Sequence, residues 1–227
     1  MSNAVLSRIA RPEPPFAPGA NNLIAGALAV WFALVVLLGA NGAFARPPGT
    51  PPLPIFIGFA APIAIFFGAY WFSRAFRAFV LGLDLRLATA IQAWRFAGLG
   101  FIALYTYGVL PGMFAWPAGL GDIAIGLTAP WVMLALQRRP EFAASKWFVA
   151  WNLFGILDLL DAIGTGTASS LLAVGAAGEV TTAPMAQLPL VLVPAFFVPI
   201  FLMLHVAALL QARRLARSGD RHDSATP

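Results

Sequence analysis

The stretch PAGLGDIAIGLTAPWVMLAL (117–136) carries one charged side chain, that of Asp122, among twenty residues. A helix needs about 20 predominantly apolar residues to cross the ~30 Å hydrocarbon core of a bilayer. The stretch therefore predicts a membrane-spanning helix. It also places a carboxylate where a charge costs about 2.5–3.5 kcal/mol on insertion scales, so Asp122 calls for a specific explanation.

The composition of the whole chain is also that of a membrane protein. Of its 227 residues 60% are hydrophobic and 10% are charged, whereas soluble domains carry about 25% charged residues. The chain contains no cysteine, which excludes disulfides, thiolate zinc sites and iron–sulfur clusters. It also lacks a P-loop motif, which excludes a P-loop ATPase. No cofactor is indicated by the sequence.

Six runs of the chain are long and apolar enough to cross a bilayer. Because the backbone must satisfy its own hydrogen bonds in lipid, these runs are expected to be helices. The prediction is an all-α, polytopic membrane bundle of about six transmembrane helices, forming a single domain over 22–211 between an N-terminal segment 1–21 and a polar tail 212–227. The predicted spans are 22–42, 54–73, 88–110, 118–137, 147–166 and 188–211.

The basic residues predict the topology of these spans. Twelve of the 14 lysines and arginines lie at the termini or in the second and fourth loops, all on one side, whereas Arg46 stands alone on the other. This asymmetry places both termini in the cytoplasm. The basic surplus then reflects attraction to anionic lipid rather than to nucleic acid. The general character is typical of multi-pass proteins of the bacterial inner membrane.

Three segments between or beside the spans leave structural alternatives. Residues 73–86 read either as an amphipathic helix at the interface, with Arg74, Arg77 and Asp84 on one face, or as an extension of the second span. A short helix is predicted around 171–177 in the longest loop. Ala43-Phe44-Ala45 fits a signal-peptide cleavage site, but the apolar run before it is longer than is usual, so the first span is expected to be retained.

Seven polar residues inside the predicted spans form what we call the polar ladder. At 1.5 Å per residue, their depths run from about 5 Å below the cytoplasmic edge for His205 to about 24 Å for Asp122. Intramembrane ionisable residues face a protein interior or a water-filled cavity, so each is a candidate for function. The ladder consists of Gln92, Arg95, Asp122, Asn152, Asp158, Asp161 and His205.

Spacing predicts which ladder residues meet. Asp158 and Asp161 are three residues apart and share a helix face, as do Gln92 and Arg95. Because an extended arginine can bridge their difference in depth, Arg95 and Asp158 are predicted to pair directly or through water. The alternative is that Arg95 snorkels to the inner headgroups.

Asp122 has two interpretations. It lies in the first turn of its predicted span, where a carboxylate would cap free N–H groups among packed glycines. Alternatively, it forms an acidic vestibule with Asp161, at a similar depth. His205 reads most simply as an interfacial histidine, and Asn152 and Gln92 as interhelical hydrogen-bond partners.

The leading functional hypothesis is a small transporter or permease that handles protons, cations or a small solute along the polar ladder. One alternative is an intramembrane enzyme acting on lipid or isoprenoid substrates, with a carboxylate metal centre built from Asp122, Asp158 and Asp161. Another is an assembly or sensor subunit of a membrane complex. The expected partners are the lipid bilayer, further copies of the chain or other membrane subunits. The sequence does not identify a substrate.

Overall fold

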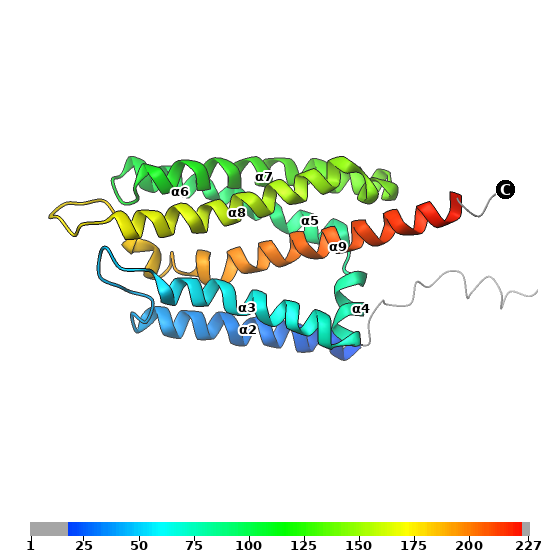
Figure 1. The fold of residues 1–227 in the computed structure, drawn as a ribbon, viewed down its shortest axis with the longest axis horizontal. Coiled ribbons are helices and arrows are strands. Elements are labelled where there is room, and N and C mark those ends of the chain that lie inside the picture. Colours follow the sequence, from blue (N-terminus) through cyan, green and yellow to red (C-terminus); the bar gives the residue numbers. More distant parts are fainter. Residues whose placement is uncertain (1–17, 224–227) are drawn as a thin grey trace, which may run out of the picture.

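The computed structural model describes residues 18–223, and the side chains of residues 22–217 within them. This part of the chain is helical without strands, and six of its helical segments are long and apolar enough to cross a membrane. Figure 1 shows them running side by side along the long axis of the molecule. They are Asn22–Ala40, Leu53–Phe72, Leu85–Thr106, Gly112–Arg138, Lys146–Leu172 and Val193–Arg217.

The helical elements divide some of these spans. The third span consists of α5, the 3₁₀ segment η1 and α6, and the last begins with the π-helical segment η4. In chain order the elements are α2 (Pro18–Ala40), α3 (Leu53–Phe72), α4 (Arg74–Gly82), α5 (Leu85–Ile91), η1 (Gln92–Gly98), α6 (Leu99–Thr106), α7 (Gly112–Arg138), η2 (Pro140–Ala144), α8 (Lys146–Leu172), η3 (Ala183–Ala186), η4 (Val193–Phe197) and α9 (Val198–Asp223).

Three predicted span limits were wrong at one end, and one of them is that of the fifth span, which was predicted to stop at 166 but continues to Leu172. The fourth span begins at Gly112, directly after Pro111, and Pro117 lies inside the helix. A proline is tolerated inside a transmembrane helix, so it is a weak marker of a helix start there. The last helix passes the predicted limit at 211 and continues to Asp223. Residues 1–17 of the predicted N-terminal segment and 224–227 of the predicted tail lie outside the described residues.

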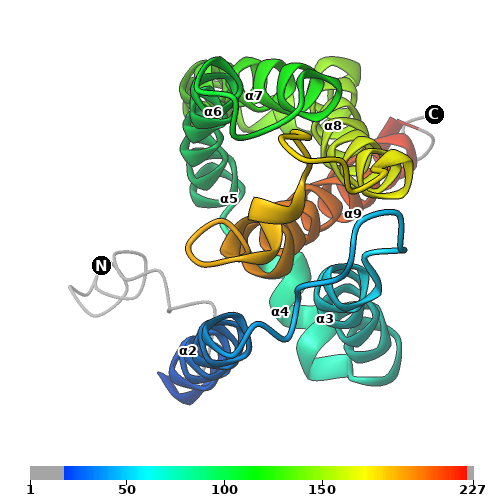
Figure 2. The same cartoon turned by 90° about the vertical axis from the view of Figure 1, so that its left-hand side faces the viewer.

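The packing is uneven around the bundle. Half of the most apolar window of the last span is buried, against 6% for the first span. Figure 2 accordingly shows α9 among other helices and α2 at the periphery. The first span contacts the rest of the described chain through Trp31, whose ring lies 4.9 Å from that of Phe196, and Val35, which packs on Val191 and Ala195.

The segment after the second span is a separate amphipathic helix, not an extension of that span. Ser73 adopts an extended conformation, and its side chain accepts a hydrogen bond from Phe76 N, which starts α4. Figure 1 shows α4 running across the end of the bundle. The grouping of Asp84 with this helix was wrong, because Asp84 caps α5 instead and accepts a hydrogen bond from Arg86 N at 2.8 Å.

The predicted short helix at 171–177 is absent. Helix α8 ends at Leu172, and the backbone N–H groups of Val174, Gly175 and Ala176 all donate to the carboxylate of Glu179. These donors hold the segment as a turn, with Gly175 at a φ of 74°. They also lower the pKa of Glu179, because they stabilise its charged form.

Candidate functional site

Arg95 lies at the centre of the bundle and binds two carboxylates from two different helices. Its Nε donates to Asp122 Oδ1 of α7 at 2.7 Å, and its Nη2 donates to Asp158 Oδ2 of α8. The Arg95 side chain is fully buried, while those of Asp158 and Asp122 retain 6% and 16% exposure. The predicted pairing of Arg95 with Asp158 is confirmed, and the snorkelling alternative is wrong.

The third nitrogen of the guanidinium, Nη1, reaches α8 and α9. Arg95 Nη1 lies 3.3 Å from Gly155 O and 3.1 Å from His205 Nε2. Because an arginine can only donate, Nε2 must accept, and the proton of a neutral His205 ring is on Nδ1. That Nδ1 then donates to Asn152 Oδ1 at 2.9 Å, and Asn152 Nδ2 donates to Phe148 O. His205 is therefore a buried member of the network and not an interfacial side chain.

We call the set of Arg95, Asp122, Asp158, His205 and Asn152 the Arg95 cluster. Gln92 lies beside it, one 3₁₀ turn before Arg95. Its Nε2 donates to Phe201 O of α9 at 3.1 Å, which confirms an interhelical role. Its Oε1 is buried without a partner among the described residues.

Glycines allow the charged side chains to approach at this depth. A Cβ on Gly121 would overlap the carboxylate of Asp158, and one on Gly98 would overlap the side chain of Asp122. A Cβ on Gly155 would likewise overlap the His205 ring. The glycines of the quoted stretch thus act as predicted, since small residues let transmembrane helices pack closely. Gly126 lies against the backbone of Phe96 in η1.

Both interpretations of Asp122 need correction. Asp122 lies ten residues into α7, far from the free N–H groups of the first turn, so the capping interpretation was wrong. Asp161 is exposed, and no hydrogen bond or ion pair joins its carboxylate to another described residue, so it is not brought into the Arg95 cluster. The carboxylate that shares the site with Asp122 is Asp158.

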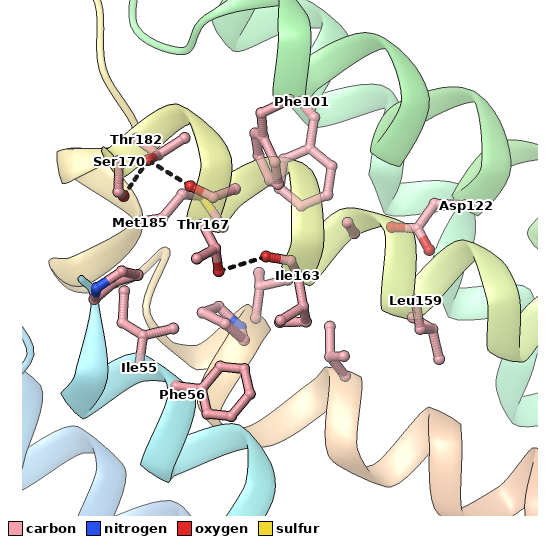
Figure 3. A pocket seen from close by; sticks show the side chains of 17 residues that line it. Ile55, Phe56, Phe101, Asp122, Leu159, Ile163, Thr167, Ser170, Thr182 and Met185 are labelled. Atoms are coloured by element: carbon pink, nitrogen blue, oxygen red, sulfur yellow. Dashed lines mark hydrogen bonds between the residues drawn. The ribbon is translucent and has the colours of Figure 1, made fainter. Parts of the chain in front are cut away.

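A cavity extends to Asp122 from the end of the bundle where the loop after α8 lies. Its empty space, counted out to the mouth, is about 650 Å³, of which the centre of a water molecule can occupy about 60 Å³. That is enough for several water molecules. Most of its walls are apolar, and its polar side chains besides Asp122 are Thr167, Ser170 and Thr182 (Figure 3).

These hydroxyl residues were missed by the sequence reasoning. Thr167 and Ser170 belong to the run GTGTASS (164–170), which was assigned to a loop but forms the last turns of α8. Small polar residues at the end of an apolar helix are the signal that could have pointed to them. Thr182 comes from the following loop, and its approach to α8 depends on tertiary structure.

The carboxylate metal centre of the enzyme hypothesis is not formed. No group of three or more metal-binding side chains of the kinds His, Cys, Asp and Glu occurs within the described part of the chain. The guanidinium of Arg95 binds both Asp122 and Asp158, in the place that a metal ion bridging the two carboxylates would need, and Asp161 is exposed.

The fold and site together define an all-helical bundle with six potential membrane spans and a buried ion-pair cluster. Residues 52–213 match the family described as Domain of unknown function (DUF8737), and the chain belongs to that family. The matched segment starts just before α3 and contains every residue of the polar ladder. No curated protein and no solved structure matches the chain.

Proposed function

We propose that this protein is a small membrane transporter that binds and moves a proton or a monovalent cation at the Arg95 cluster. The observation that carries the proposal is a charge imbalance. One buried arginine contacts two carboxylates, and His205 accepts from Arg95 and is therefore neutral. With both carboxylates ionised, the cluster carries one net negative charge.

A net charge in a buried site is costly, because Coulombic pairing must offset the loss of hydration of every ion. Uptake of one proton or one monovalent cation makes the cluster neutral. The cavity supports access to this position, because Asp122 is both a ligand of Arg95 and a lining residue of the cavity. A carboxylate that can take up and release a cation, on the wall of a cavity with room for water, is what a proton or cation carrier requires.

Two irregular helical segments support a role in movement. Arg95 lies in the 3₁₀ segment η1, and the π-helical segment η4 contributes Val193 and Pro194 to the cavity wall. Such segments inside longer helices often mark hinges or functional sites. Broken helices around a central site are also a recurrent feature of transporters. We propose that the backbone of η1 and η4 bends when the protein changes the access to Asp122.

The test is ion flux in proteoliposomes. Purified protein is reconstituted with a pH-sensitive dye inside the vesicles, and proton entry is followed after a pH jump, with parallel arms under sodium and potassium gradients. We expect the wild type to dissipate one gradient, and Asp122→Asn and Asp158→Asn to fall to the rate of protein-free vesicles. Asp84→Asn serves as the control, since Asp84 lies outside the spans and pairs with Arg86.

Protein content is matched by quantitative blotting of the vesicles, and the fold of each variant by circular dichroism. Full flux in both spanning variants would remove the Arg95 cluster from the transport path. Absence of flux in the wild type under all three gradients would contradict the proposal itself.

A second candidate is a subunit of a membrane complex, and one observation favours it. Asp161 is exposed on α8, eleven residues before the end of that helix and within a span. A basic or hydrogen-bonding side chain of another subunit or copy would offset the cost of a charge at that depth. Sizing in mild detergent should then show a larger particle for the wild type than for Asp161→Leu, whereas equal sizes would contradict this candidate.

A further inference from the structure

The three hydroxyl groups of the cavity are hydrogen-bonded to backbone carbonyls or to each other. Thr167 Oγ1 donates to Ile163 O at 2.7 Å, and Thr182 Oγ1 donates to Gly166 O at 3.2 Å. Ser170 Oγ lies 2.8 Å from Thr182 Oγ1, and either hydroxyl can be the donor in that pair. Figure 3 shows these bonds along the wall of the cavity. Toward a ligand, the hydroxyls offer lone pairs.

The one charged side chain of the cavity is an acceptor too. Asp122 uses Oδ1 for Arg95, and its Oδ2 has no hydrogen bond to any described residue. The carbonyl of Pro194, another lining residue, lacks its usual helical donor, because the N–H of Val198 bonds to Val193 O instead. The next position, Pro199, has no N–H to offer. Both Pro194 and Asp122 line the cavity.

The rest of the wall is apolar. Rings and aliphatic side chains from α3, α6, α7, α8 and α9 surround the space between the hydroxyls and Asp122. A hard metal ion prefers a shell of oxygen ligands and water, which this wall does not supply. The apolar wall suits the hydrocarbon part of an organic molecule. The lining residues of this kind include Phe56, Phe101, Phe114, Leu159, Ile163 and Val198.

From the free oxygen of Asp122 and the apolar wall beside it we infer that the cavity binds a small organic ammonium ion, with the nitrogen at Asp122 and a short hydrocarbon body against the apolar wall. An ammonium group brings up to three N–H donors and no acceptor, which complements the Asp122 carboxylate and the lone pairs of the hydroxyls. Its positive charge also neutralises the Arg95 cluster. The inference rests on the proposed function in that it names the organic cation that the transporter carries.

Ligands of other classes fit this chemistry less well. A carboxylate or phosphate would meet the charge of Asp122 and find no cationic or N–H-bearing side chain among the lining residues. A neutral alkyl chain would leave Oδ2 of Asp122 unpaired, and unpaired buried acceptors are costly. A lipid tail entering the cavity from the bilayer is the competing occupant that the test must separate.

Binding is measured on the full chain in lipid nanodiscs by isothermal titration calorimetry. The probes are pentylammonium, 1-pentanol and pentanoate, which share one hydrocarbon chain and differ in the head group. We expect saturable binding of pentylammonium to the wild type and none of the other two. Loss of a charge-assisted hydrogen bond is expected to weaken pentylammonium binding to Asp122→Asn by about ten- to a hundredfold.

A second pair of variants protects the test against misfolding of Asp122→Asn. Thr167→Val removes one acceptor from the cavity wall without changing its shape. Thr165→Val makes the same change on the same helix, where the hydroxyl bonds to Asp161 O and lies outside the cavity. We expect weaker binding in Thr167→Val and unchanged binding in Thr165→Val.

The outcomes separate this inference from the proposed function. Equal binding of pentylammonium and 1-pentanol, insensitive to Asp122→Asn, would overturn the inference and identify a cavity for lipid tails. Proton or cation flux in the wild type without pentylammonium binding would overturn the inference and leave the proposed function in place. Specific pentylammonium binding without any flux would support the site and contradict the transport role.

Discussion

At the scale of single residues, Arg95 is the counter-charge for the two buried carboxylates of the bundle. Its guanidinium satisfies Asp122, Asp158, the Gly155 carbonyl and His205 at once. A fully buried charge is tolerated only with partners of this kind. The same side chain is the reason why two aspartates from different helices lie within the span region.

Arg95→Ala leaves two buried carboxylates without their partner. Breaking a buried pair by removing one side typically costs about 3–5 kcal/mol, so we expect a large drop in the unfolding midpoint in detergent. Asp158→Asn combined with Arg95→Gln removes both charges of the Arg95–Asp158 pair and should recover part of the lost stability. The measurement is a double-mutant cycle of thermal unfolding. Additive losses would show that Arg95 and Asp158 are not coupled.

Glu179 predicts a pH dependence in the long loop. Backbone N–H groups lower its pKa below the ordinary value of 4.5, so the folded loop favours the charged carboxylate. The resulting stabilisation is fully present above pH 4.5 and is lost as the pH falls through the lowered folded pKa. Limited proteolysis of residues 173–182 by an acid-stable protease should therefore accelerate on acidification. In Glu179→Gln the same loop should be cut readily at every pH tested, and a pH response like that of the wild type would contradict this assignment.

At the scale of the elements, glycines allow α7 to pack closely against the third span. Gly126 of α7 lies against the backbone of Phe96, and Gly119 lies against Gly98 O and the side chain of Ile102. Backbone atoms cannot move aside as a flexible side chain can. The position of η1, and with it of Arg95, therefore depends on glycines of α7.

Gly126→Ala tests this close approach. The added methyl group would overlap the backbone of Phe96, so we expect lower yield, a lower unfolding midpoint and loss of any flux. Gly100→Ala is the matched control, because a Cβ there meets nothing within 4 Å. Alanine is the better helix former by about 1 kcal/mol, so the control should be neutral or slightly stabilised. Equal behaviour of the two variants would show that α7 and η1 are not in tight contact.

At the scale of the whole molecule, the cavity and the family-matched segment occupy the same part of the chain. The cavity is lined by residues between Pro52 and Val198, all within 52–213. The first span lies outside that segment and buries little of its surface. The site is thus a property of the last five spans.

Topology is the prediction that belongs to this scale. The distribution of the basic residues predicts that both termini lie in the cytoplasm, so the cavity end of the bundle is expected to face the opposite side of the membrane. Reporter proteins are fused at Gly108 and Gly175, which both lie in loops at that end. Alkaline phosphatase fused there should be enzymatically active, and green fluorescent protein fused there should not fluoresce. Fusions at Arg139 should show the reverse. A fluorescent signal at Gly175 would invert the predicted orientation.

The sequence alone was sufficient for the helical class, for six segments that could span a membrane, and for the pairing of Arg95 with Asp158. The first two features depend on local hydropathy, and the pairing was predicted from the depth of each residue along its span. Only the tertiary structure placed Asp122 on Arg95 instead of at a helix start, and turned Asp161 outward although it lies one turn from Asp158. It also brought Thr182 to the cavity, where its hydroxyl meets that of Ser170. Those outcomes depend on how the helices rotate and pack, and helix rotation is set by contacts between residues far apart in the chain, such as Gly121 with Asp158 and Gly126 with Phe96.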